Sequence, residues 1–408
     1  MIDNRIDDLK ELGREIEKNK EELIKGMISD TGTTFKHANV ELNLAVNALK
    51  TFDEDEIVVI NRDSLGEVGL VLPYNAAGVL FAISVGGAYL PGNKLRVKLS
   101  SKSTQTSRFL ESLIKNTLSD VQIEYVKGEK FITECLLDTK IKGLQVYGHD
   151  SWARKYIDMV KSTKTKFVFE GPGNCPLLVL SDANIRDAVK GAVASGIKLN
   201  SGQICMSSER FYVHEEILEN FLEEILKEIE SLKVGDPRDE KTDVGPLGSV
   251  RVAANIKSQI EDAVNKGAKV EMGNRAEVFR LDGLKTYLVY PTVLTNVNHS
   301  MMIMQEETFG PVIPIQTFKE EKEVVMLAND NRYGLSAVIY GNNTFNVANK
   351  LRFTHGLVLE NKTVTNGFDP HQPWGGFKDS GWIWEWQGND FKIRDGPKLF
   401  SIEFSRGK

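Results

Sequence analysis

The chain has 408 residues, enough for roughly two or three domains of the usual size. Its 51 Lys and Arg against 57 Asp and Glu leave a net charge of −6, which argues against non-specific nucleic-acid binding. A hydrophobic share of 41% excludes a disordered chain, and 3 cysteines cannot build a disulfide framework, so we expect a soluble, cytoplasmic protein.

The first part of the chain alternates between helical and strand patterns. Apolar residues recur near a 3.6-residue period over 3–28, which predicts an amphipathic helix, and a second helix is predicted over 36–50. Residues 57–63 have the composition of a strand. Further strands are predicted at 68–73, 93–100, 121–128, 141–148 and 165–173. Strands separated by helices indicate βαβ units and a parallel sheet.

An uncharged run from Val68 to Asn93 is long enough to cross a bilayer. It is interrupted by Pro73, Asn75 and Pro91, however, and a broken backbone would lack hydrogen-bond partners in lipid. A buried strand followed by a sharp turn and a buried helix explains the run better, so we expect no membrane span. The charged start of the chain does not fit a secretory signal.

A second α/β segment follows Gly173. It begins with a predicted strand over 176–183, a helix over 185–199, a strand over 210–215 and an amphipathic helix over 216–233. After a turn-rich loop, later strands are predicted at 287–297, 311–318, 335–341 and 356–362. Because no repeat or long linker separates the two segments, we expect two interlocked α/β domains.

Three residues are candidates for chemistry, each with a simpler alternative. Cys205 follows a glycine-containing turn, where backbone N–H groups can favour a reactive thiolate, although a lone cysteine is more often a small core residue. Glu170 ends a strand and could be a general base with a raised pKa, or a solvated charge. Asn75 could donate to an oxyanion, or cap a turn.

Several familiar sites are not supported by the sequence. EGPGN does not match the GxGxxG fingerprint, and no GxxxxGK[ST] loop is present. The six histidines show no metal-ligand spacing, so we expect no metal site. No Ser-His-Asp triad can be argued from spacing alone. The residues by themselves therefore indicate an α/β protein of enzyme-like character and no more.

Ten sequence blocks, taken in order, resemble the aldehyde dehydrogenase superfamily. They are LPYN (72–75), KLSSKS (98–103), FEGPGNCP (169–176), SGQICMSSERFYV (201–213), KVGDP (233–237), VGPL (244–247), YPTVL (290–294), EETFGPV (306–312), YGLSA (333–337) and PWGGFKDSG (373–381). The resemblance implies a Rossmann-type cofactor domain over 1–171, a catalytic domain over 172–372 and a return to the cofactor domain over 373–395. It also implies oligomerisation strands at 51–66 and 396–408, and hence a homodimer or homotetramer.

The resemblance also implies a reaction. Cys205 would attack the aldehyde carbonyl, and Asn75 with the backbone N–H of Cys205 would hold the oxyanion. Hydride would pass to a nicotinamide cofactor and leave a thioester, which water activated by Glu170 would hydrolyse. A coenzyme A-acylating enzyme is an alternative that Glu170 argues against, because acylating relatives typically lack this glutamate. A catalytically silent protein on the same fold is a second alternative.

The cofactor would be NADP or NAD. By resemblance, Lys98 would contact the adenosine ribose, Glu307 the nicotinamide ribose, and Phe309 the ring. The resemblance also places Pro73, Tyr74, Gly148, His149 and Gly171 along the cofactor. Ser101 stands where NAD-preferring relatives often carry a glutamate, so we slightly favour NADP, whose 2′-phosphate a carboxylate would repel.

Two departures from the family pattern stand out. The pyrophosphate turn reads VYGHDSWA (146–153), with His149 where a serine is expected, and the chain opens at what resembles the family's first long helices.

The resemblance does not identify one substrate. Ile204, just before the cysteine, offers no cation for a phosphate, and the block around it is similar to that of relatives acting on aromatic aldehydes or small hydroxyaldehydes.

Overall fold

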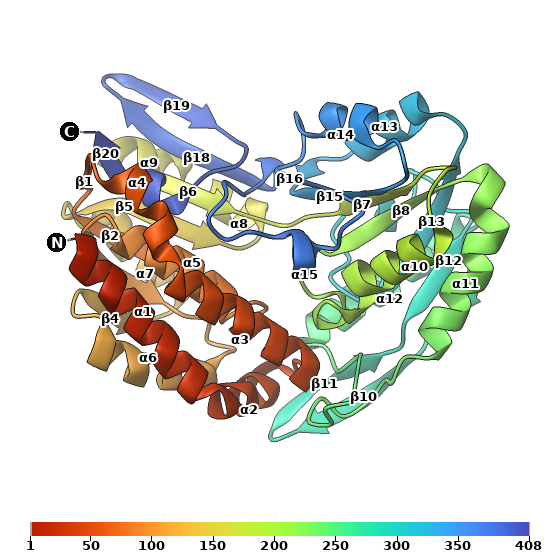
Figure 1. The fold of residues 1–408 in the computed structure, drawn as a ribbon, viewed down its shortest axis with the longest axis horizontal. Coiled ribbons are helices and arrows are strands. Elements are labelled where there is room, and N and C mark those ends of the chain that lie inside the picture. Colours follow the sequence, from red (N-terminus) through yellow and green to blue (C-terminus); the bar gives the residue numbers. More distant parts are fainter. Residues whose placement is uncertain (1, 408) are drawn as a thin grey trace.

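The computed structural model describes residues 2–407, and its strands include two seven-stranded sheets. Each sheet lies in its own half of the molecule, with helices packed against it (Figure 1). The first sheet has the strand order β19-β18-β6-β5-β2-β3-β4, and the second has the order β16-β15-β7-β8-β13-β12-β9. The predicted α/β fold with parallel strands is therefore confirmed.

The first sheet combines an early part of the chain with a late one. Its parallel strands are β2 (Glu67–Val71), β3 (Lys94–Lys98), β4 (Val121–Glu124), β5 (Ile141–Tyr147) and β6 (Lys166–Glu170). Its antiparallel strands are β18 (Gly381–Gln387) and β19 (Asp390–Arg394). Trp382 and Trp384 of β18 pack on Phe169 and Phe167 of β6, so the aromatic block after residue 381 belongs to the core.

The helices of this half are α1 (Ile2–Lys18), α2 (Lys20–Thr31), α3 (Phe35–Lys50), α5 (Val79–Tyr89), α6 (Thr104–Thr117), α7 (Gly128–Leu137), α8 (Asp150–Arg154) and α9 (Ile157–Thr163). The single helix predicted over 3–28 is wrong in one respect, because it is divided at Asn19. The Asn19 side-chain amide donates to the backbone oxygen of Glu15, 2.8 Å away. Such a local bond competes with the helical pattern and explains the break.

The uncharged run forms β2, a turn and the buried helix α5. Every residue of α5 except Val79 is buried, which is why its sequence lacks a polar face. A Cβ at Gly86 would lie 2.1 Å from Phe52 Cε2, so glycine permits the close approach of the segment after α3. Within residues 2–407, no helix is both long and apolar enough to cross a membrane.

The second sheet is formed by the middle of the chain. Its strands are β7 (Cys175–Val179), β8 (Ser208–His214), β9 (Lys269–Met272), β12 (Thr292–Thr295), β13 (Val312–Phe318), β15 (Ser336–Tyr340) and β16 (Leu357–Glu360). Its helices are α10 (Ile185–Val193), α11 (Leu218–Glu230), α12 (Val250–Asn265), α13 (Glu321–Asn329) and α14 (Phe345–Leu351). A hairpin of β10 (Ala276–Leu281) and β11 (Leu284–Val289) projects beside α12 (Figure 1).

The strand predicted over 57–63 is mostly wrong. The helix α4 (Glu56–Val59) occupies its first part, and only β1 (Arg62–Ser64) is a strand. In α4 only Val59 is buried, while Ile57 is 82% exposed, so the apolar residues here do not form the buried face of a strand. Acidic residues before α4 also favour a helix start.

The strand that the resemblance implies over 396–408 is present only near its end, and residue 408 lies outside the described residues. Phe400–Glu403 form the helix α16, and only β20 (Ser405–Gly407) is a strand. Phe400 and Phe404 are both buried, and their spacing of four residues fits one face of a helix. β20 pairs with β1 of the same chain.

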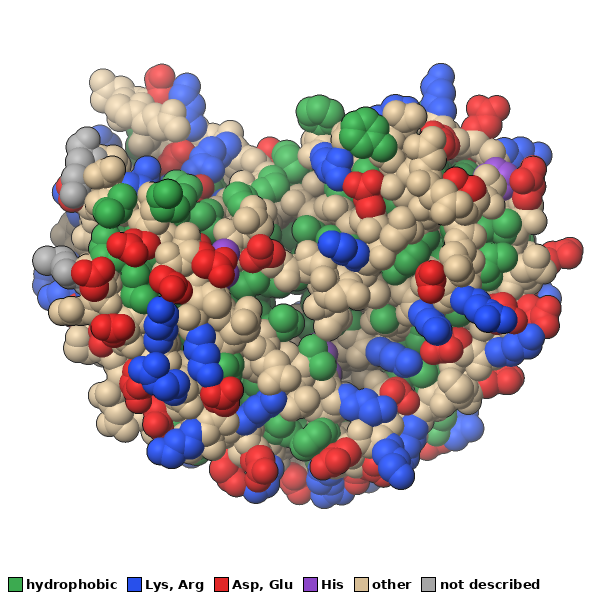
Figure 2. Space-filling view, in the orientation of Figure 1, with side chains coloured by type: hydrophobic (Ala, Val, Ile, Leu, Met, Phe, Trp, Pro, Cys, Tyr) green, Lys and Arg blue, Asp and Glu red, His purple; other side chains and the backbone are tan. Residues whose placement is uncertain are grey.

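The outer surface carries charges of both signs. Figure 2 shows Lys and Arg mixed with Asp and Glu on this face, and the surface is hollowed between the two halves. This distribution fits the small net charge of −6.

Candidate active site

One cavity of about 360 Å³ lies at the carboxyl ends of the first sheet's parallel strands. Such crevices are where open α/β sheets bind ligands. All twelve site residues predicted from the sequence line this cavity: Pro73, Tyr74, Asn75, Lys98, Ser101, Gly148, His149, Glu170, Gly171, Cys205, Glu307 and Phe309. The fold therefore brings them together, while their individual roles stay predictions.

Cys205 lies on a strained loop between α10 and β8. After α10, a π-helical turn (Ala194–Lys198) leads into residues 200–202, where Ser201 has φ 56° and Gly202 has φ 78°. A Cβ at Gly202 would lie 2.3 Å from the backbone carbon of Gly310, so only glycine fits. Cys205 is partly exposed, whereas Cys135 and Cys175 are buried.

Asn75 connects the first sheet to this loop. Its side-chain Nδ2 donates to the backbone oxygen of Gln203, 3.1 Å away. Asn200 Nδ2 in turn donates to the backbone oxygen of Asn75 at 2.9 Å. Asn75 is 8% exposed, and these two bonds fix its amide beside the cysteine loop.

Burial acts against a thiolate at Cys205. It raises the pKa of the Cys205 thiol well above its ordinary value, and the nearby carboxylate of Glu307 raises it further. A backbone hydrogen bond from Met206 acts in the opposite direction and lowers this pKa, which is the effect expected of a backbone N–H group at the turn. The net shift favours the protonated thiol in the free protein.

Glu170 lies at the end of β6 and lines the same cavity, and burial raises the pKa of its carboxyl. Its side chain forms an ion pair with Lys398, and its Oε2 accepts a hydrogen bond from the backbone N–H of Gly376 at 3.2 Å. Both side chains of the pair are almost fully buried. Lys398 was not singled out from the sequence, because it lies 228 residues from Glu170.

Glu209 holds the segment that carries Glu307 and Phe309. Its two carboxylate oxygens accept from the backbone N–H groups of Thr308 at 2.8 Å and Phe309 at 2.7 Å. These bonds keep Phe309 in the left-handed conformation, with φ 58°. Glu307 Oε1 accepts from the backbone N–H of Gly173 at 3.0 Å, so Glu307 faces the strand exit beside Cys205.

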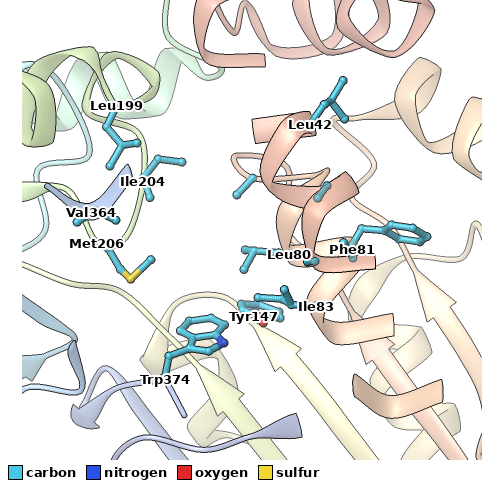
Figure 3. Packing of buried hydrophobic residues seen from close by; sticks show 14 of the residues in the cluster. Leu42, Leu80, Phe81, Ile83, Tyr147, Leu199, Ile204, Met206, Val364 and Trp374 are labelled. Atoms are coloured by element: carbon cyan, nitrogen blue, oxygen red, sulfur yellow. The ribbon is translucent and has the colours of Figure 1, made fainter. Parts of the chain in front are cut away.

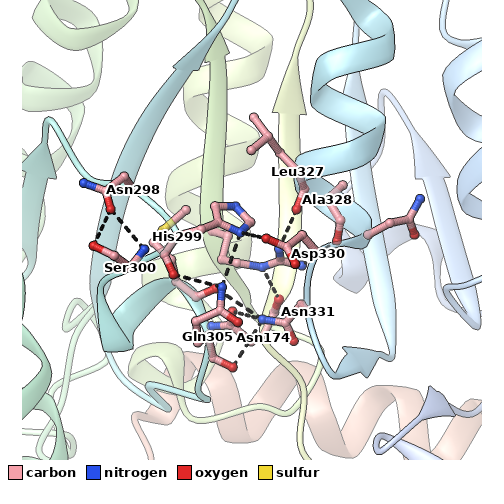
Figure 4. Close-up of polar contacts among 12 residues, drawn as sticks. Asn174, Asn298, His299, Ser300, Gln305, Leu327, Ala328, Asp330 and Asn331 are labelled. Carbon is pink, nitrogen blue, oxygen red and sulfur yellow. Dashed lines mark hydrogen bonds and ion pairs between the residues drawn. The ribbon is translucent and has the colours of Figure 1, made fainter.

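A network of amides fixes the residues just before Glu307. Asn174 and Asn331, joined by a 3.0 Å hydrogen bond, donate to backbone oxygens of residues 303–306 (Figure 4). Asn174 Nδ2 also donates to Glu209 Oε2 at 3.2 Å, and Arg210 Nε donates to the backbone oxygen of Asn174 at 2.7 Å. Buried polar groups thus anchor the segment before Glu307, together with the apolar packing of Ile303 and Met304.

A second, smaller cavity of about 60 Å³ opens on the other side of Cys205. Its lining is mostly apolar and comes from both halves of the molecule, with Leu80 of α5 facing Ile204, Met206 and Trp374 (Figure 3). Leu199, Val364 and Phe368 complete its apolar wall, and His37, Glu41 and Thr365 are among its polar lining residues. No Lys or Arg lines it within residues 2–407. Cys205 therefore lines both cavities, the larger one with several polar groups in its wall and the smaller, apolar one.

The family model of the aldehyde dehydrogenase family matches residues 1–390. The chain belongs to this family. It is 31% identical over 387 residues to lactaldehyde dehydrogenase of Methanococcus vannielii, covering 89% of this chain and 80% of that one. It is 30% identical over 383 residues to mitochondrial succinate-semialdehyde dehydrogenase of Oryza sativa, covering 89% and 71%.

A solved structure shows the same fold. The crystal structure of succinate-semialdehyde dehydrogenase from Burkholderia pseudomallei matches with a TM-score of 0.88 and 26% identity, covering 100% of this chain and 84% of that one. Together with the family match, this makes the chain an aldehyde dehydrogenase, an oxidoreductase that uses NAD or NADP.

The larger cavity of this aldehyde dehydrogenase suits a nicotinamide dinucleotide. Lys98, almost fully buried, lies at the end of β3, and Lys102 lies with its ammonium 4.3 Å from the centre of the Tyr74 ring. Burial lowers the pKa of Lys102, and the neighbouring Arg251 lowers it further. Arg251 could not be assigned to this site from the sequence, because it is distant in the sequence from Lys102 and lies in no recognised motif.

His149 lies at the start of α8 and also lines the larger cavity. Its Nδ1 accepts from the backbone N–H of Ser151 at 3.4 Å and thereby caps α8. In this aldehyde dehydrogenase the imidazole thus caps a helix at the cavity, and its contact with the cofactor stays a prediction.

Proposed function

We propose that this aldehyde dehydrogenase oxidises a small, uncharged aldehyde to the carboxylic acid through a thioester on Cys205. The observation that carries the proposal is that Cys205 lines two cavities, a larger one that also holds Lys98, Glu170 and Glu307 and a smaller, apolar one. An aldehyde in the smaller cavity and a nicotinamide in the larger one would meet at the sulfur. The first sheet then serves the cofactor, and the second sheet supplies the nucleophile.

The first step is attack on the carbonyl carbon. The thiol proton leaves to solvent water as the C–S bond forms, so that Glu170, on the same cavity, stays ionised for the later hydrolysis. Negative charge develops on the carbonyl oxygen, where the Asn75 amide, already fixed beside the cysteine loop, can donate. Fixed donors of this kind stabilise a developing oxyanion by about 3–4 kcal/mol.

The later steps yield the acid. When bound, the nicotinamide supplies the hydride acceptor for the carbon attached to sulfur. Glu170 then takes a proton from water as the water oxygen adds to the thioester carbon, and the C–S bond breaks to release the acid. The presence of Glu170 on the cavity supports hydrolysis over transfer to coenzyme A.

The apolar cavity supports a small neutral substrate. Its wall offers no cation to a substrate carboxylate, and Glu41 would repel one. The volume of about 60 Å³ holds only a few heavy atoms. The similarity to a lactaldehyde dehydrogenase agrees with such a substrate, and we therefore favour small hydroxyaldehydes over aromatic aldehydes.

Three residues support a preference for NADP. Ser101 is exposed at the cavity, Lys102 is close by, and Arg251 lies near enough to affect its pKa. A hydroxyl beside two cations can bind a 2′-phosphate through charge-assisted hydrogen bonds. NAD is the second candidate.

We also propose a cytoplasmic homo-oligomer. All three cysteines are free, which fits a reducing compartment. β19 has an unpaired outer edge with Ile393 61% exposed, and such an edge is prone to pair with another chain. Light scattering of the purified protein would show a dimer or tetramer, and a monomer would contradict this part.

The activity is tested by following the absorbance of reduced nicotinamide, with NAD and NADP in parallel. The panel contains lactaldehyde, glyceraldehyde, benzaldehyde, succinic semialdehyde and an aliphatic aldehyde. We expect turnover of lactaldehyde without coenzyme A and release of the free acid. A requirement for coenzyme A would instead establish the acylating alternative.

A further inference from the structure

Glu170 and Lys398 form a buried ion pair that the reaction described above leaves unexplained. The Lys398 side chain is 1% exposed and the Glu170 side chain 2%. Lys398 Nζ donates to Glu170 Oε1, and Oε2 accepts from Gly376 N at 3.2 Å. Both oxygens of the catalytic carboxylate are therefore engaged in this structure.

The chain packs tightly against the pair on the side of Gly375. Gly375 has φ +129°, and a Cβ there would lie 2.6 Å from Glu170 Oε1 and 2.8 Å from Lys398 Nζ. The backbone of Lys398 is fixed as well, because its N–H donates to Trp374 O at 2.8 Å and its oxygen accepts from Trp374 N at 3.1 Å. The glycines of PWGG thus make space for the ion pair.

Other charged and titratable groups surround Glu170 on the neighbouring elements. Tyr147 of β5 lies in register with it, and Cys205 shares its cavity. Glu403 of α16 raises the pKa of Glu170, although Glu403 is itself paired with Lys166 and Arg394. Burial is the largest influence on Glu170, and Lys398 is the main group that opposes it.

We propose that Lys398 is a positioning residue that keeps Glu170 ionised inside the protein, so that Glu170 can accept a proton from the hydrolytic water. This inference rests on the proposed function. In the step concerned, the water oxygen bonds to the acyl carbon, the water proton goes to Glu170, and the C–S bond breaks with the electron pair on sulfur. Lys398 acts through Glu170 and does not touch the substrate.

The physical reason is the cost of a lone buried charge. Without the Lys398 ammonium, the burial of Glu170 would raise the pKa of the carboxyl further, and the group would hold its proton at neutral pH. A protonated carboxyl cannot accept a proton from water. The thioester would still form more readily than it would hydrolyse, and acyl-enzyme would accumulate.

The test compares Lys398→Met with Lys398→Arg. For Lys398→Met we expect a burst of reduced nicotinamide followed by steady-state turnover about 10- to 100-fold slower than wild type at pH 7, in line with the usual contribution of a general base. The acid limb of the pH profile of its kcat should move to higher pH. The difference in kcat between the variant and the wild type should therefore shrink near pH 9. Lys398→Arg should return the acid limb towards that of the wild type.

A double variant separates positioning from general structural support. In a Glu170→Gln background, Lys398→Met should cost almost nothing further, because Lys398 acts only through the carboxylate. Equal losses in both backgrounds, or an unshifted pH profile in Lys398→Met, would overturn the inference. Should Lys398→Met fail to fold by circular dichroism, Lys398→Gln is compared in the same way. A folded wild type without turnover would instead refute the proposed function.

Discussion

The side-chain amide of Asn75 donates a hydrogen bond to the backbone oxygen of Gln203, 3.1 Å away and two residues before Cys205. Asn75 follows a strand of the first sheet, and Gln203 precedes a strand of the second. One bond therefore fixes Asn75, the proposed oxyanion donor, against the loop of Cys205, the proposed nucleophile, across the two halves of the molecule.

Replacing Asn75 by alanine tests the oxyanion role. We expect kcat to fall about 10²- to 10³-fold for the aldehyde, since a fixed donor is lost where charge develops. The lost bond to Gln203 should lower the free energy of unfolding by only about 1 kcal/mol. Steady-state kinetics and urea denaturation measure the two effects. A large loss of stability with a small loss of kcat would show that Asn75 is structural.

The acidity of Cys205 is accessible through alkylation. Because burial raises the pKa of this thiol well above its ordinary value, its reaction with iodoacetamide should speed up with pH and show no plateau below about pH 9. Peptide mapping should find no label on Cys135 or Cys175, which are buried. A plateau near neutral pH would mean that the free protein already holds a thiolate.

Cofactor preference is tested by Ser101→Glu. A carboxylate at this exposed position should repel a 2′-phosphate, so the ratio of kcat/KM for NADP to that for NAD should fall by about 10-fold or more. Thr104→Glu is the matched control, because it adds the same charge on an exposed residue that does not line the cavity. Equal shifts in both variants would attribute the effect to general charge rather than to Ser101.

The apolar cavity predicts discrimination against acidic aldehydes. Butanal and succinic semialdehyde share a four-carbon chain but differ by a carboxylate, which would meet Glu41 and no cation in this cavity. We expect kcat/KM to be at least about 10-fold higher for butanal, because an unpaired charge is costly to bury. A preference for succinic semialdehyde would refute the assignment of a neutral substrate.

Glu209 should give the protein a distinctive dependence of stability on pH. Burial raises the pKa of Glu209 to about 7 in the folded protein, above its unfolded value of 4.5. The folded state therefore holds a proton that the unfolded chain has lost, and this stabilising contribution, full below about pH 4.5, disappears as pH rises to about 7.

Glu209→Gln removes this titration while keeping the shape of the side chain. Between pH 5 and pH 8 the wild type should lose about 2 kcal/mol more unfolding free energy than the variant, measured by urea denaturation. The variant should also bind cofactor more weakly, because an amide cannot accept from both Thr308 and Phe309. Parallel pH curves for the two proteins would contradict the shift assigned to Glu209.

Sequence patterns predicted the fold well where each element has one buried face. The alternation of strands and helices identified both sheets, and α3 follows its predicted range almost residue for residue. The failures at α4 and α16 have a common cause. In both segments β-branched and aromatic residues suggested a strand. The structure has short helices instead, because α16 packs against α5 and α4, and an acidic residue lies in the first turn of each helix.

The candidate site was predicted by resemblance and not by spacing. Cys205, Glu170 and Asn75 lie in recognisable blocks, and the fold places them on one cavity. Lys398, Glu209 and Arg251 could not be assigned, because their importance depends on contacts between residues distant in the sequence. The raised pKa of Cys205 likewise follows from burial, which a turn motif does not reveal.

The most direct test of the central claim compares wild type with Cys205→Ala in a reduced-nicotinamide assay. Lactaldehyde is supplied with NADP or NAD, and both proteins are first shown to be folded. We predict steady turnover by the wild type and none above background by the variant, because no other thiol lines the junction of the two cavities in the described chain. Wild-type rates in Cys205→Ala would contradict the claim that this sulfur carries the acyl group.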